Sequence, residues 1–547
     1  MRDINHIINV WRNSNKFDKN TKENIKAMNL NELKLAFDSE LEFGTAGLRG
    51  ILGLGTNRMN KYTVFRAAEA MSLWIKQKYN NPKVIVGNDI RYGSEEFRNI
   101  LISVFNKYSI NVIAFDIPIN TPELSYSIKK TNSNAGFMIT ASHNPKNYNG
   151  IKVFKETSSQ ILQDDADIIK NFMDNLDYKD LEYKISDNLV FENGEYLLSN
   201  YINDVIDLSL YKNVDPKNKL LYTPFNGCAL RPIKAILDKK GYSYTVYREH
   251  KDFDPDFTTI PYPNPEVMDN FDDIVEYAKE NNYNIIIAND PDGDRMNALI
   301  KNGNQFKLLG GNILGALFIK YIIDRRNDLN LHPGVIVKTI VTDDFGKTIA
   351  QKNGYKVLET LTGFKNISNV AINLKDDEFI FGYEESIGYE IGDLVRDKDG
   401  ISACMFFADM VEYYSSKNVT IADLLSTLYN EYGYFEENNF SIPFEGVNPV
   451  DKMKLFMHEL RSFIPNEING LKLIKCIDYL KTDDESLKTD ALQLYLEDET
   501  KISLRPSGTE PKLKIYIHSH NNNKDLAIEN INKVTQWITE RIDKINE

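Results

Sequence analysis

Cysteine is scarce in this chain, with three residues among 547, and the three lie far apart at Cys228, Cys404 and Cys476. An odd number of isolated thiols without metal-site spacing excludes a disulfide scaffold and a cysteine zinc site. Long apolar runs are also missing, because none approaches the roughly 20 residues that span a bilayer. The stretch 1–15 is polar and has no secretory apolar segment. We therefore expect a reduced, cytoplasmic protein with no membrane partner.

Basic residues are fewer than acidic ones, with 65 Lys and Arg against 79 Asp and Glu and a net charge of −14. This balance gives no electrostatic support for a nucleic-acid partner. Small anions must instead be bound by local basic groups. A hydrophobic content of 42% with 26% charged residues is normal for a globular protein, and 547 residues exceed a single core. We expect three to five domains.

Strand and helix patterns alternate along the first part of the chain. After an amphipathic helical segment at 1–40, helices are predicted at 62–79, 95–108, 124–130 and 164–177, and strands at 83–87, 111–115 and 136–139. This order indicates an α/β domain with a mostly parallel sheet covered on both faces. The segment 178–215 is acidic and less regular.

Two further α/β units and a different last unit follow. The second has strands at 219–223, 243–247 and 285–288 and helices at 229–239 and up to 281; the third has strands near 334–340, 357 and 378–382 and a helix at 402–415. After about 436 the pattern becomes α+β, with strands near 472–477, 491–496 and 513–518 and a closing helix at 526–542. No sequence repeat is evident.

Ser142 lies in the loop Thr140–Pro145, directly after the apolar strand 136–139. The Asn144-Pro145 dipeptide is a turn signal that ends the strand. Functional loops of parallel sheets lie at the carboxyl ends of strands. A serine at such a place is ordinary by itself, and its interpretation as a nucleophile depends on His143, Lys152 and an acidic loop further on.

That acidic loop holds Asp290, Asp292 and Asp294 directly after the apolar strand 285–288. Three alternating carboxylates cannot all be buried without a cation, because each would lose several kcal/mol of solvation. Alternate positions of an extended loop direct their oxygens to one side, which suits a hard divalent ion. A calcium loop is the rival interpretation, but Arg295 replaces its sixth-position glycine and Lys301 its twelfth-position acid. Mg²⁺ fits better.

Three other loops carry polar groups between glycines. In the segment 44–50, Arg49 can offer a forked donor set to phosphate, although a plain glycine-rich turn is equally favoured. Glu384 and Ser386, between two glycines, suit sugar hydroxyls, although acids are usually solvated. The segment 505–510 presents an arginine, two hydroxyls and a glycine N–H, a set of donors for a phosphate dianion. Its rival interpretation is a surface hairpin turn.

Four motifs in this order resemble those of the α-D-phosphohexomutases: T-A-S-H-N-P at 140–145, D-P-D-G-D-R at 290–295, G-Y-E-E-S-I-G at 382–388 and R-P-S-G-T-E-P at 505–511. The opening F-G-T-A-G-L-R-G at 43–50, with N-R-M-N at 57–60, is similar to the branch that contains phosphoglucomutase-2 and phosphopentomutase. The resemblance extends over almost the whole chain.

The resemblance implies four domains around a central cleft, the first three sharing one α/β topology with mixed or mostly parallel sheets and the fourth α+β. The expected bounds are 1–215 with the phosphoserine loop, 216–325 with the metal loop, 326–436 with the sugar loop and 437–547 with the phosphate loop.

The implied activity is interconversion of glucose 1-phosphate and glucose 6-phosphate through phosphoserine at Ser142 and a sugar 1,6-bisphosphate, which also acts as activator. Mg²⁺ would be held by Ser142, Asp290, Asp292 and Asp294. Phosphopentomutase or phosphomannomutase activity by the same mechanism is the alternative. A serine phosphoesterase, which would have little need of a second phosphate site, and a non-catalytic phosphosugar-binding protein are the other hypotheses.

The remaining site residues follow from the same resemblance. Proton transfer is assigned to His143, Lys152 or Arg49. The substrate, a small phosphosugar bound by a monomer or weak dimer, is expected to contact Arg295, Thr362, Gly363, Lys365, Glu384, Ser386, Lys398, Arg505, Ser507, Gly508 and Thr509.

Overall fold

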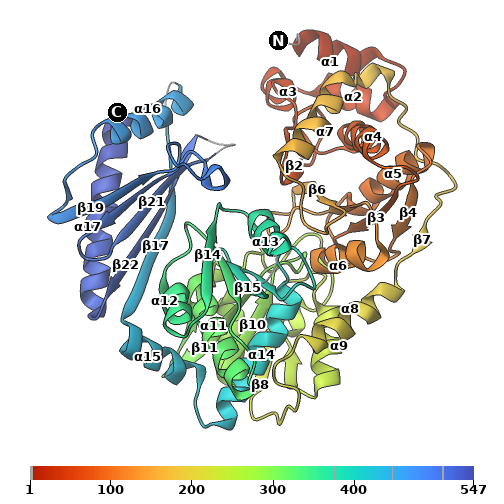
Figure 1. Ribbon diagram of the computed structural model, residues 1–547. Helices are drawn as coiled ribbons and strands as arrows, with labels where there is room; N and C mark the ends of the chain where they lie inside the picture. The colour runs from red at the N-terminus through yellow and green to blue at the C-terminus, as the bar shows by residue number, and fades with distance from the viewer. Residues whose placement is uncertain (1–3, 375–376, 446–447, 508–510, 547) are drawn as a thin grey trace.

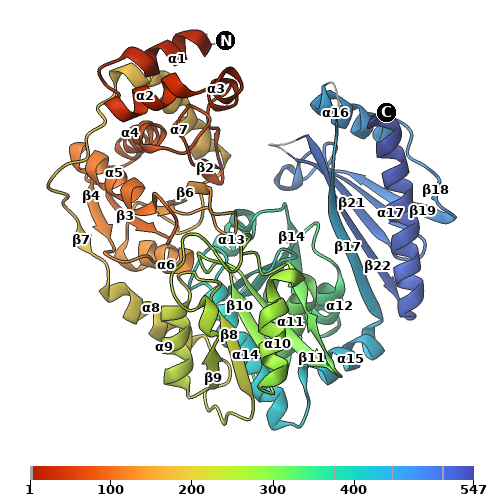
Figure 2. The ribbon, with the colours of Figure 1, turned by 180° about the vertical axis from the view of Figure 1, so that it is seen from behind.

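Four β-sheets with their own helices follow one another along the chain in the computed structural model (Figure 1). The structure describes residues 4–374, 377–445, 448–507 and 511–546. The first unit and the fourth face each other across an open side, and the second and third units join them below. The view from behind shows the same arrangement (Figure 2). The interior of this arc is where loops from all four units can meet.

The first unit is a seven-stranded sheet in the order β1-β2-β6-β5-β3-β4-β7. Its strands are β1 (Phe43–Gly44), β2 (Gly47–Ile51), β3 (Lys83–Asn88), β4 (Asn111–Ala114), β5 (Ala135–Ile139), β6 (Tyr148–Lys155) and β7 (Glu192–Asn193). Its helices are α1 (Ile4–Asn13), α2 (Lys19–Ala27), α3 (Leu30–Phe37), α4 (Lys61–Lys78), α5 (Ser94–Lys107), α6 (Thr121–Thr131), α7 (Gln163–Asn175) and α8 (Tyr196–Asp207).

The second unit has the strand order β12-β11-β10-β8-β9 and the third β14-β13-β15-β16. The second contains β8 (Lys219–Thr223), α9 (Leu230–Lys240), β9 (Ser243–Val246), α10 (Asp272–Glu280), β10 (Ile285–Asn289), β11 (Met296–Asn302) and β12 (Gln305–Leu308). The third contains α11 (Gly310–Asp328), β13 (Val335–Thr339), α12 (Phe345–Lys352), β14 (Lys356–Thr360), α13 (Phe364–Asn373), β15 (Phe379–Glu384), β16 (Gly388–Ile391), α14 (Gly400–Ser416) and α15 (Ile421–Tyr432).

One strand arrangement recurs in these three units. Three parallel strands lie side by side in the orders β4-β3-β5, β9-β8-β10 and β14-β13-β15, and an antiparallel strand, β6, β11 or β16, follows the third. The mixed sheets and the shared topology confirm the expected fold. The loop from the third parallel strand to the antiparallel strand therefore lies at the same place on the sheet in all three units.

The fourth unit is a six-stranded sheet in the order β17-β22-β21-β20-β19-β18. All its strand pairs are antiparallel, which confirms the change of class after about 436. Its elements are β17 (Tyr434–Pro443), α16 (Pro449–Ser462), β18 (Glu467–Ile468), β19 (Leu471–Asp478), β20 (Leu492–Leu496), β21 (Lys501–Pro506), β22 (Lys512–Asn521) and α17 (Lys524–Asn546).

The second and third units share one continuous apolar core, in which α11 and α14 pack between the two sheets. The first and fourth units have separate cores. Because interiors are close-packed, a shared core fixes the second and third units relative to each other. Loops from these two units therefore have a rigid common base. Among helices of the described residues, none has the length and apolar character that a membrane span requires.

One prediction about secondary structure is wrong. The segment 178–215 was expected to be less regular, without a predicted helix, yet it contains helix α8, whose inner face buries Leu197, Leu198, Tyr201, Ile202 and Val205. These residues recur at helical spacing, but polar and acidic neighbours dilute the pattern. Helix α8 packs on α6 and α9, so it bridges the first and second units.

Glu123 in α6 lies at this bridge and is almost completely buried. Burial raises the pKa of its carboxyl group to about 8. In the folded state the group therefore keeps its proton at pH values where the unfolded chain has lost it. Stability must fall as pH rises from about 4.5 to 8, by at most about 1.4 kcal/mol per pH unit.

Glu123→Gln removes the ionisable group. We therefore expect the variant to become more stable relative to wild type as pH increases. Differential scanning calorimetry at pH 5.5, 7 and 8.5 would show the melting temperature of the variant rising relative to wild type across the series. A constant difference between the two proteins at all three pH values would contradict the assignment.

Candidate active site

The three predicted functional loops of the first three units occupy the same topological position. Ser142 lies between β5 and β6, the acidic loop 290–294 between β10 and β11, and Glu384 with Ser386 at the turn between β15 and β16. Each loop therefore connects the third parallel strand to the antiparallel strand. The carboxyl ends of parallel strands are where open α/β sheets bind ligands. The fold thus directs all three loops to the interior of the arc.

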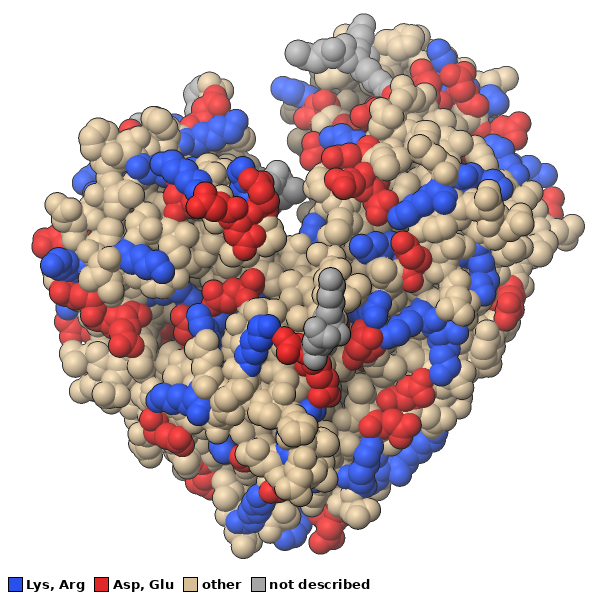
Figure 3. All heavy atoms as spheres, viewed as in Figure 1, with Lys and Arg blue, Asp and Glu red and all other residues tan. Residues whose placement is uncertain are grey.

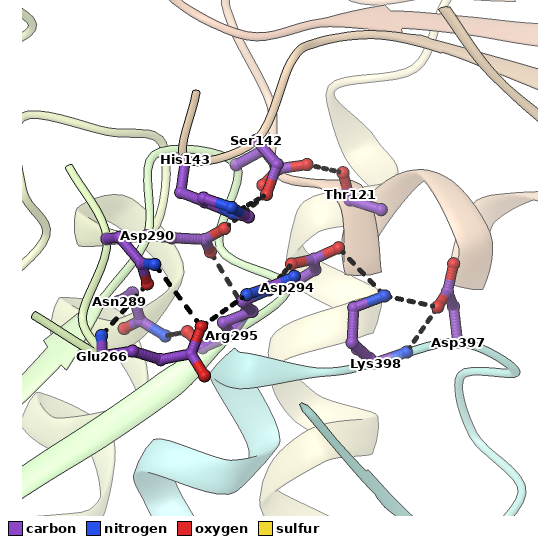
Figure 4. A network of polar contacts seen from close by, with 12 residues as sticks. Thr121, Ser142, His143, Glu266, Asn289, Asp290, Asp294, Arg295, Asp397 and Lys398 are labelled. Atoms are coloured by element: carbon purple, nitrogen blue, oxygen red, sulfur yellow. Dashed lines mark hydrogen bonds and ion pairs between the residues drawn. The ribbon is translucent and has the colours of Figure 1, made fainter. Parts of the chain in front are cut away.

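Ser142 is held in a left-handed backbone conformation, with φ of +52°. Its backbone N–H donates to the Thr140 hydroxyl at 2.9 Å. Its own hydroxyl donates to Asp290 Oδ2 at 2.7 Å and lies 3.2 Å from His143 Nδ1 (Figure 4). The strained turn therefore presents the serine oxygen directly to the second unit's acidic loop, as the sequence predicted from two distant segments.

Asp290, Asp292 and Asp294 form one buried cluster in which a carboxylate oxygen from each lies within 4.8 Å of the others. Lys152 enters this cluster from β6, with its ammonium 2.6 Å from Asp292 Oδ2 and 2.7 Å from Asp294 Oδ2. The Oδ1 atoms of Asp292 and Asp294 have no hydrogen-bond partner among the described residues. Hard oxygen ligands in this arrangement could hold a divalent metal ion.

The carboxyl groups of Asp290 and Asp294 have pKa values shifted in opposite directions. Burial, with the charges of Asp292 and Asp294, raises the pKa of Asp290 well above its ordinary value. Burial alone would raise that of Asp294, but Lys152 and Lys398 hold its pKa below the ordinary range. Lys152 therefore supplies one positive charge to the cluster from the protein itself.

Proton-transfer candidates differ in their charge. Burial and the nearby guanidinium groups of Arg295 and Arg49 lower the pKa of His143 well below its ordinary value, so the imidazole is neutral at pH 7. Burial acts to lower the pKa of Lys152, but Asp292 and Asp294 raise it above the ordinary lysine value. His143 can therefore accept a proton, whereas Lys152 stays charged.

Arg91 supports the serine loop, and no role was predicted for it. Its buried guanidinium donates to the carbonyl oxygens of Ser142 and Asn144, and to that of Pro145 at 2.8 Å. Asp89 lies 3.3 Å from Arg91 Nε. A buried Asp-x-Arg at the end of a strand was a visible signal, but the sequence did not show that it faces the loop 140–145.

Thr121 and Lys398 complete the surroundings of the acids. The Thr121 hydroxyl donates to Asp292 Oδ2 at 2.6 Å, a contact between units that was not predicted. Lys398 lies 3.4 Å from Asp294 and 3.3 Å from Asp397 (Figure 4). Arg295 donates to Glu266 at 3.1 Å on the side of the cavity. Lys398 and Arg295 thus face both the acidic cluster and the open interior.

A cavity of about 580 Å³ opens beside this cluster, with residues of all four units in its wall. Figure 3 shows the hollow between the first and fourth units on one face. The predicted site residues in the wall are Arg295, Thr362, Gly363, Lys365, Glu384, Ser386, Lys398 and Arg505. The cavity wall therefore brings together Arg295 beside the acidic loop, the sugar loop and Arg505 of the phosphate loop, which are far apart in sequence.

The sugar loop and the phosphate loop meet at the segment 362–365. Glu384 accepts a hydrogen bond from the Gly363 N–H at 2.7 Å, and Arg505 donates to the Thr362 hydroxyl. Lys514 pairs with Arg505 across β21 and β22 and also lines the cavity. Burial and the charge of Arg505 lower the pKa of Lys514. This second cation was not predicted; period-2 alternation from Tyr516 could have placed it on the cavity face.

The other predicted residues have simpler outcomes. Arg49 is exposed and donates to Asn144 at 3.2 Å, so it lies beside the serine loop. The Ser507 N–H donates to the Lys512 carbonyl at 2.9 Å, next to the paired strands β21 and β22. Gly508 and Thr509 lie outside the described residues.

The chain belongs to the phosphoglucomutase/phosphomannomutase family. Family models of its alpha/beta/alpha domains I, II and III match residues 40–180, 199–303 and 310–432. A phosphoglucomutase of Staphylococcus haemolyticus is 34% identical over 529 residues, which cover 92% of this chain and 93% of the relative.

Solved structures share the fold at lower identity. The phosphoglucomutase parafusin from Paramecium, in its open form, has a TM-score of 0.71 at 19% identity and covers 93% of this chain and 96% of its own. An N-acetylphosphoglucosamine mutase from Aspergillus fumigatus, solved with GlcNAc-6P and magnesium, has a TM-score of 0.53 at 12% identity, with coverage of 93% and 96%.

We expect Asp292→Asn to weaken Mn²⁺ binding by at least about tenfold, because one anionic ligand of the cluster is lost. Electron paramagnetic resonance of free Mn²⁺ measures this directly. Asp397→Asn is the matched control, since Asp397 is equally buried but bonds to Lys398 outside the trio. Similar binding by Asp292→Asn and wild type would remove Asp292 from the metal site.

Proposed function

We propose that the protein is a phosphoglucomutase that interconverts glucose 1-phosphate and glucose 6-phosphate through phosphoserine at Ser142. The observation that carries the proposal is the hydrogen bond between Ser142 and Asp290 beside a cavity lined by Arg505. The curated relatives named phosphoglucomutase, 32–34% identical over most of the chain, support this substrate. The E-E-S form of the sugar loop, at residues 384–386, resembles that of glucose-preferring family members and supports glucose over mannose phosphates, while pentose phosphates stay the alternative.

The reaction consists of two phosphoryl transfers. In the first, the bond between Ser142 Oγ and phosphorus breaks while the 6-hydroxyl oxygen of glucose 1-phosphate forms a bond to phosphorus and loses its proton. The product is glucose 1,6-bisphosphate. After this intermediate turns over, Ser142 takes the 1-phosphoryl group, and the 1-oxygen gains a proton to give glucose 6-phosphate. Phosphate is conserved, so no water enters the balance.

His143 is the best candidate for the proton transfer. Its Nδ1 lies 3.2 Å from Ser142 Oγ, and burial keeps the imidazole neutral. A neutral imidazole can accept a proton at neutral pH. Lys152, bonded to Asp292 and Asp294, is fully protonated and instead neutralises the acidic loop.

Asp290, Asp292 and Asp294, together with Ser142, would hold Mg²⁺. When bound, the ion would polarise the phosphoryl group and offset its negative charge. The unpartnered Oδ1 atoms of Asp292 and Asp294 support this fit. The Aspergillus neighbour was solved with magnesium, which supports the choice of metal.

Turnover of the bisphosphate requires one site that binds whichever phosphate is not reacting. Arg505 and Lys514, with Ser507, Gly508 and Thr509, are proposed for this site. Glu384 and Ser386 would bind the 3- and 4-hydroxyls in both orientations, because those positions nearly exchange when the sugar rotates. The carboxyl group of Glu384 is buried and poorly solvated, and this burial raises its pKa.

The finer predictions about the molecule's setting belong to the same proposal: a cytoplasmic monomer or weak dimer, activated by a sugar 1,6-bisphosphate, with no nucleic-acid or membrane partner. A coupled assay with glucose, mannose and ribose 1-phosphates, with and without bisphosphate, tests substrate and activator together.

Ser142→Ala should lower mutase activity at least about 1,000-fold, because the phosphoryl carrier is removed. The coupled assay with glucose 1-phosphate measures it. Ser158→Ala is the matched control, a buried serine with φ of +65° and no hydrogen-bond partner for its hydroxyl among the described residues. Substantial activity in Ser142→Ala would reject the phosphoserine assignment.

Arg505→Ala should weaken glucose 6-phosphate binding by about 10- to 100-fold, since charge-assisted hydrogen bonds contribute about 1.5–3 kcal/mol each. The affinity of Arg505→Lys should lie between those of wild type and Arg505→Ala, because a lysine side chain cannot form a forked pair of hydrogen bonds with phosphate. Isothermal titration calorimetry gives the affinities. Arg461→Ala in the same unit, which removes ion pairs with Asp478 and Asp490 outside the cavity wall, should bind normally. Wild-type affinity in Arg505→Ala would exclude Arg505 from the phosphate site.

A further inference from the structure

The loop 339–344, which we name the docking loop, attaches the fourth unit to the third. Gln493 of β20 donates to the Ile340 carbonyl at 2.7 Å, and Lys501 of β21 donates to the Thr342 carbonyl at 3.0 Å. An apolar cluster covers these contacts, formed by Ile340, Val341, Tyr479, Ala491 and Tyr516. Because Arg505 is the penultimate residue of β21, the docking loop positions the strand that carries the proposed phosphate site.

Glu385 connects the sugar loop to this docking loop. Its Oε2 accepts hydrogen bonds from the hydroxyls of Thr339 at 3.4 Å and Thr342 at 3.3 Å. The two hydroxyls are themselves 2.8 Å apart. Glu385 thus contacts the same threonine whose carbonyl binds Lys501 of the fourth unit.

The main chain of Glu385 is fixed by close packing. At Gly311, in the first turn of α11, an added Cβ would lie 2.2 Å from the Glu385 carbonyl oxygen. Such a contact leaves no space for any other residue at position 311. The next residue, Asn312, accepts from the Asp343 N–H at 3.1 Å, so α11 supports both the sugar loop and the docking loop. Glu385 therefore has a rigid support behind it while its side chain lines the cavity.

We propose that Glu385 is a positioning residue that fixes the spacing between the sugar loop and the phosphate site. This inference rests on the proposed function, in which Glu384 and Ser386 bind sugar hydroxyls while Arg505 binds the distal phosphate of the same molecule. A ligand held at two points binds tightly only if the two points keep the right separation. Glu385 links the sugar loop to the docking loop through Thr339 and Thr342, which do not line the cavity. This link is separate from the contacts of Thr362 and Gly363, which are in the cavity wall.

The test compares two probes. Glucose 6-phosphate must engage both loops, whereas inorganic phosphate needs only the phosphate site. Isothermal titration calorimetry should show that Glu385→Ala weakens the binding of glucose 6-phosphate at least about fivefold and the binding of inorganic phosphate less than about twofold. The double variant Thr339→Val/Thr342→Val, which removes both hydroxyls without changing the cavity wall, should reproduce this selective loss. Glu385→Gln, which keeps an acceptor oxygen, should retain most of the wild-type affinity for glucose 6-phosphate.

The matched control is Glu378→Gln. Glu378 pairs with Arg326 at 2.7 Å in the same unit but makes no contact with the sugar loop or the docking loop among the described residues, so the ratio of the two affinities should stay at the wild-type value. Equal losses for both probes in Glu385→Ala, or no loss for glucose 6-phosphate in the double threonine variant, would overturn the inference. Failure of wild type to bind glucose 6-phosphate at all would reject the proposed function, and the inference with it.

Discussion

The site depends on three buried carboxylates that cannot exist together without nearby positive charge. Asp290, Asp292 and Asp294 lie on one loop of the second unit, and the ammonium group of Lys152 reaches two of them from the first. Removing several charges from water costs more than any single hydrogen bond returns, so the first and second units must dock accurately for the cluster to form. Ser142 Oγ is placed by this docking, because its partner Asp290 belongs to the other unit.

Repetition of one topology explains why residues 142, 290 and 384 converge. Each lies at the connection from the third parallel strand to the antiparallel strand, so three similar sheets direct similar loops toward one interior space. The shared core of the second and third units fixes the acidic and sugar loops together. The fourth unit has its own core, and the docking loop is one of its attachments to the third unit, beside the contact of Asn312 with Glu437. Because the docking loop binds the strand that carries Arg505, it bears on the distance between the phosphate and sugar contacts.

Much of this arrangement could be predicted from sequence, because short strands followed by polar loops carry strong local signals. Ser142 and the three aspartates were predicted as one cluster, and the structure places them in contact. Arg91 and Thr121 were not assigned, since each contacts a segment far away in the chain, and Lys514 was not assigned, because strand alternation alone does not show that its face of the sheet lines the cavity. The charge of Lys152 also required the structure, because only its contacts with two buried acids show that its pKa is raised and its ammonium form favoured.

The central claim is that Ser142 carries the phosphoryl group between enzyme and sugar. The most direct measurement is peptide mapping by mass spectrometry after incubation of the wild-type protein with Mg²⁺ and glucose 1,6-bisphosphate whose phosphoryl groups carry ¹⁸O, followed by a chase with unlabelled glucose 1-phosphate. The account predicts one labelled phosphoryl group on the peptide that contains Ser142, and its exchange for an unlabelled one during the chase while the label appears in glucose 6-phosphate. A peptide that stays unmodified, or a phosphate that appears on another residue and is transferred from there, would contradict the account.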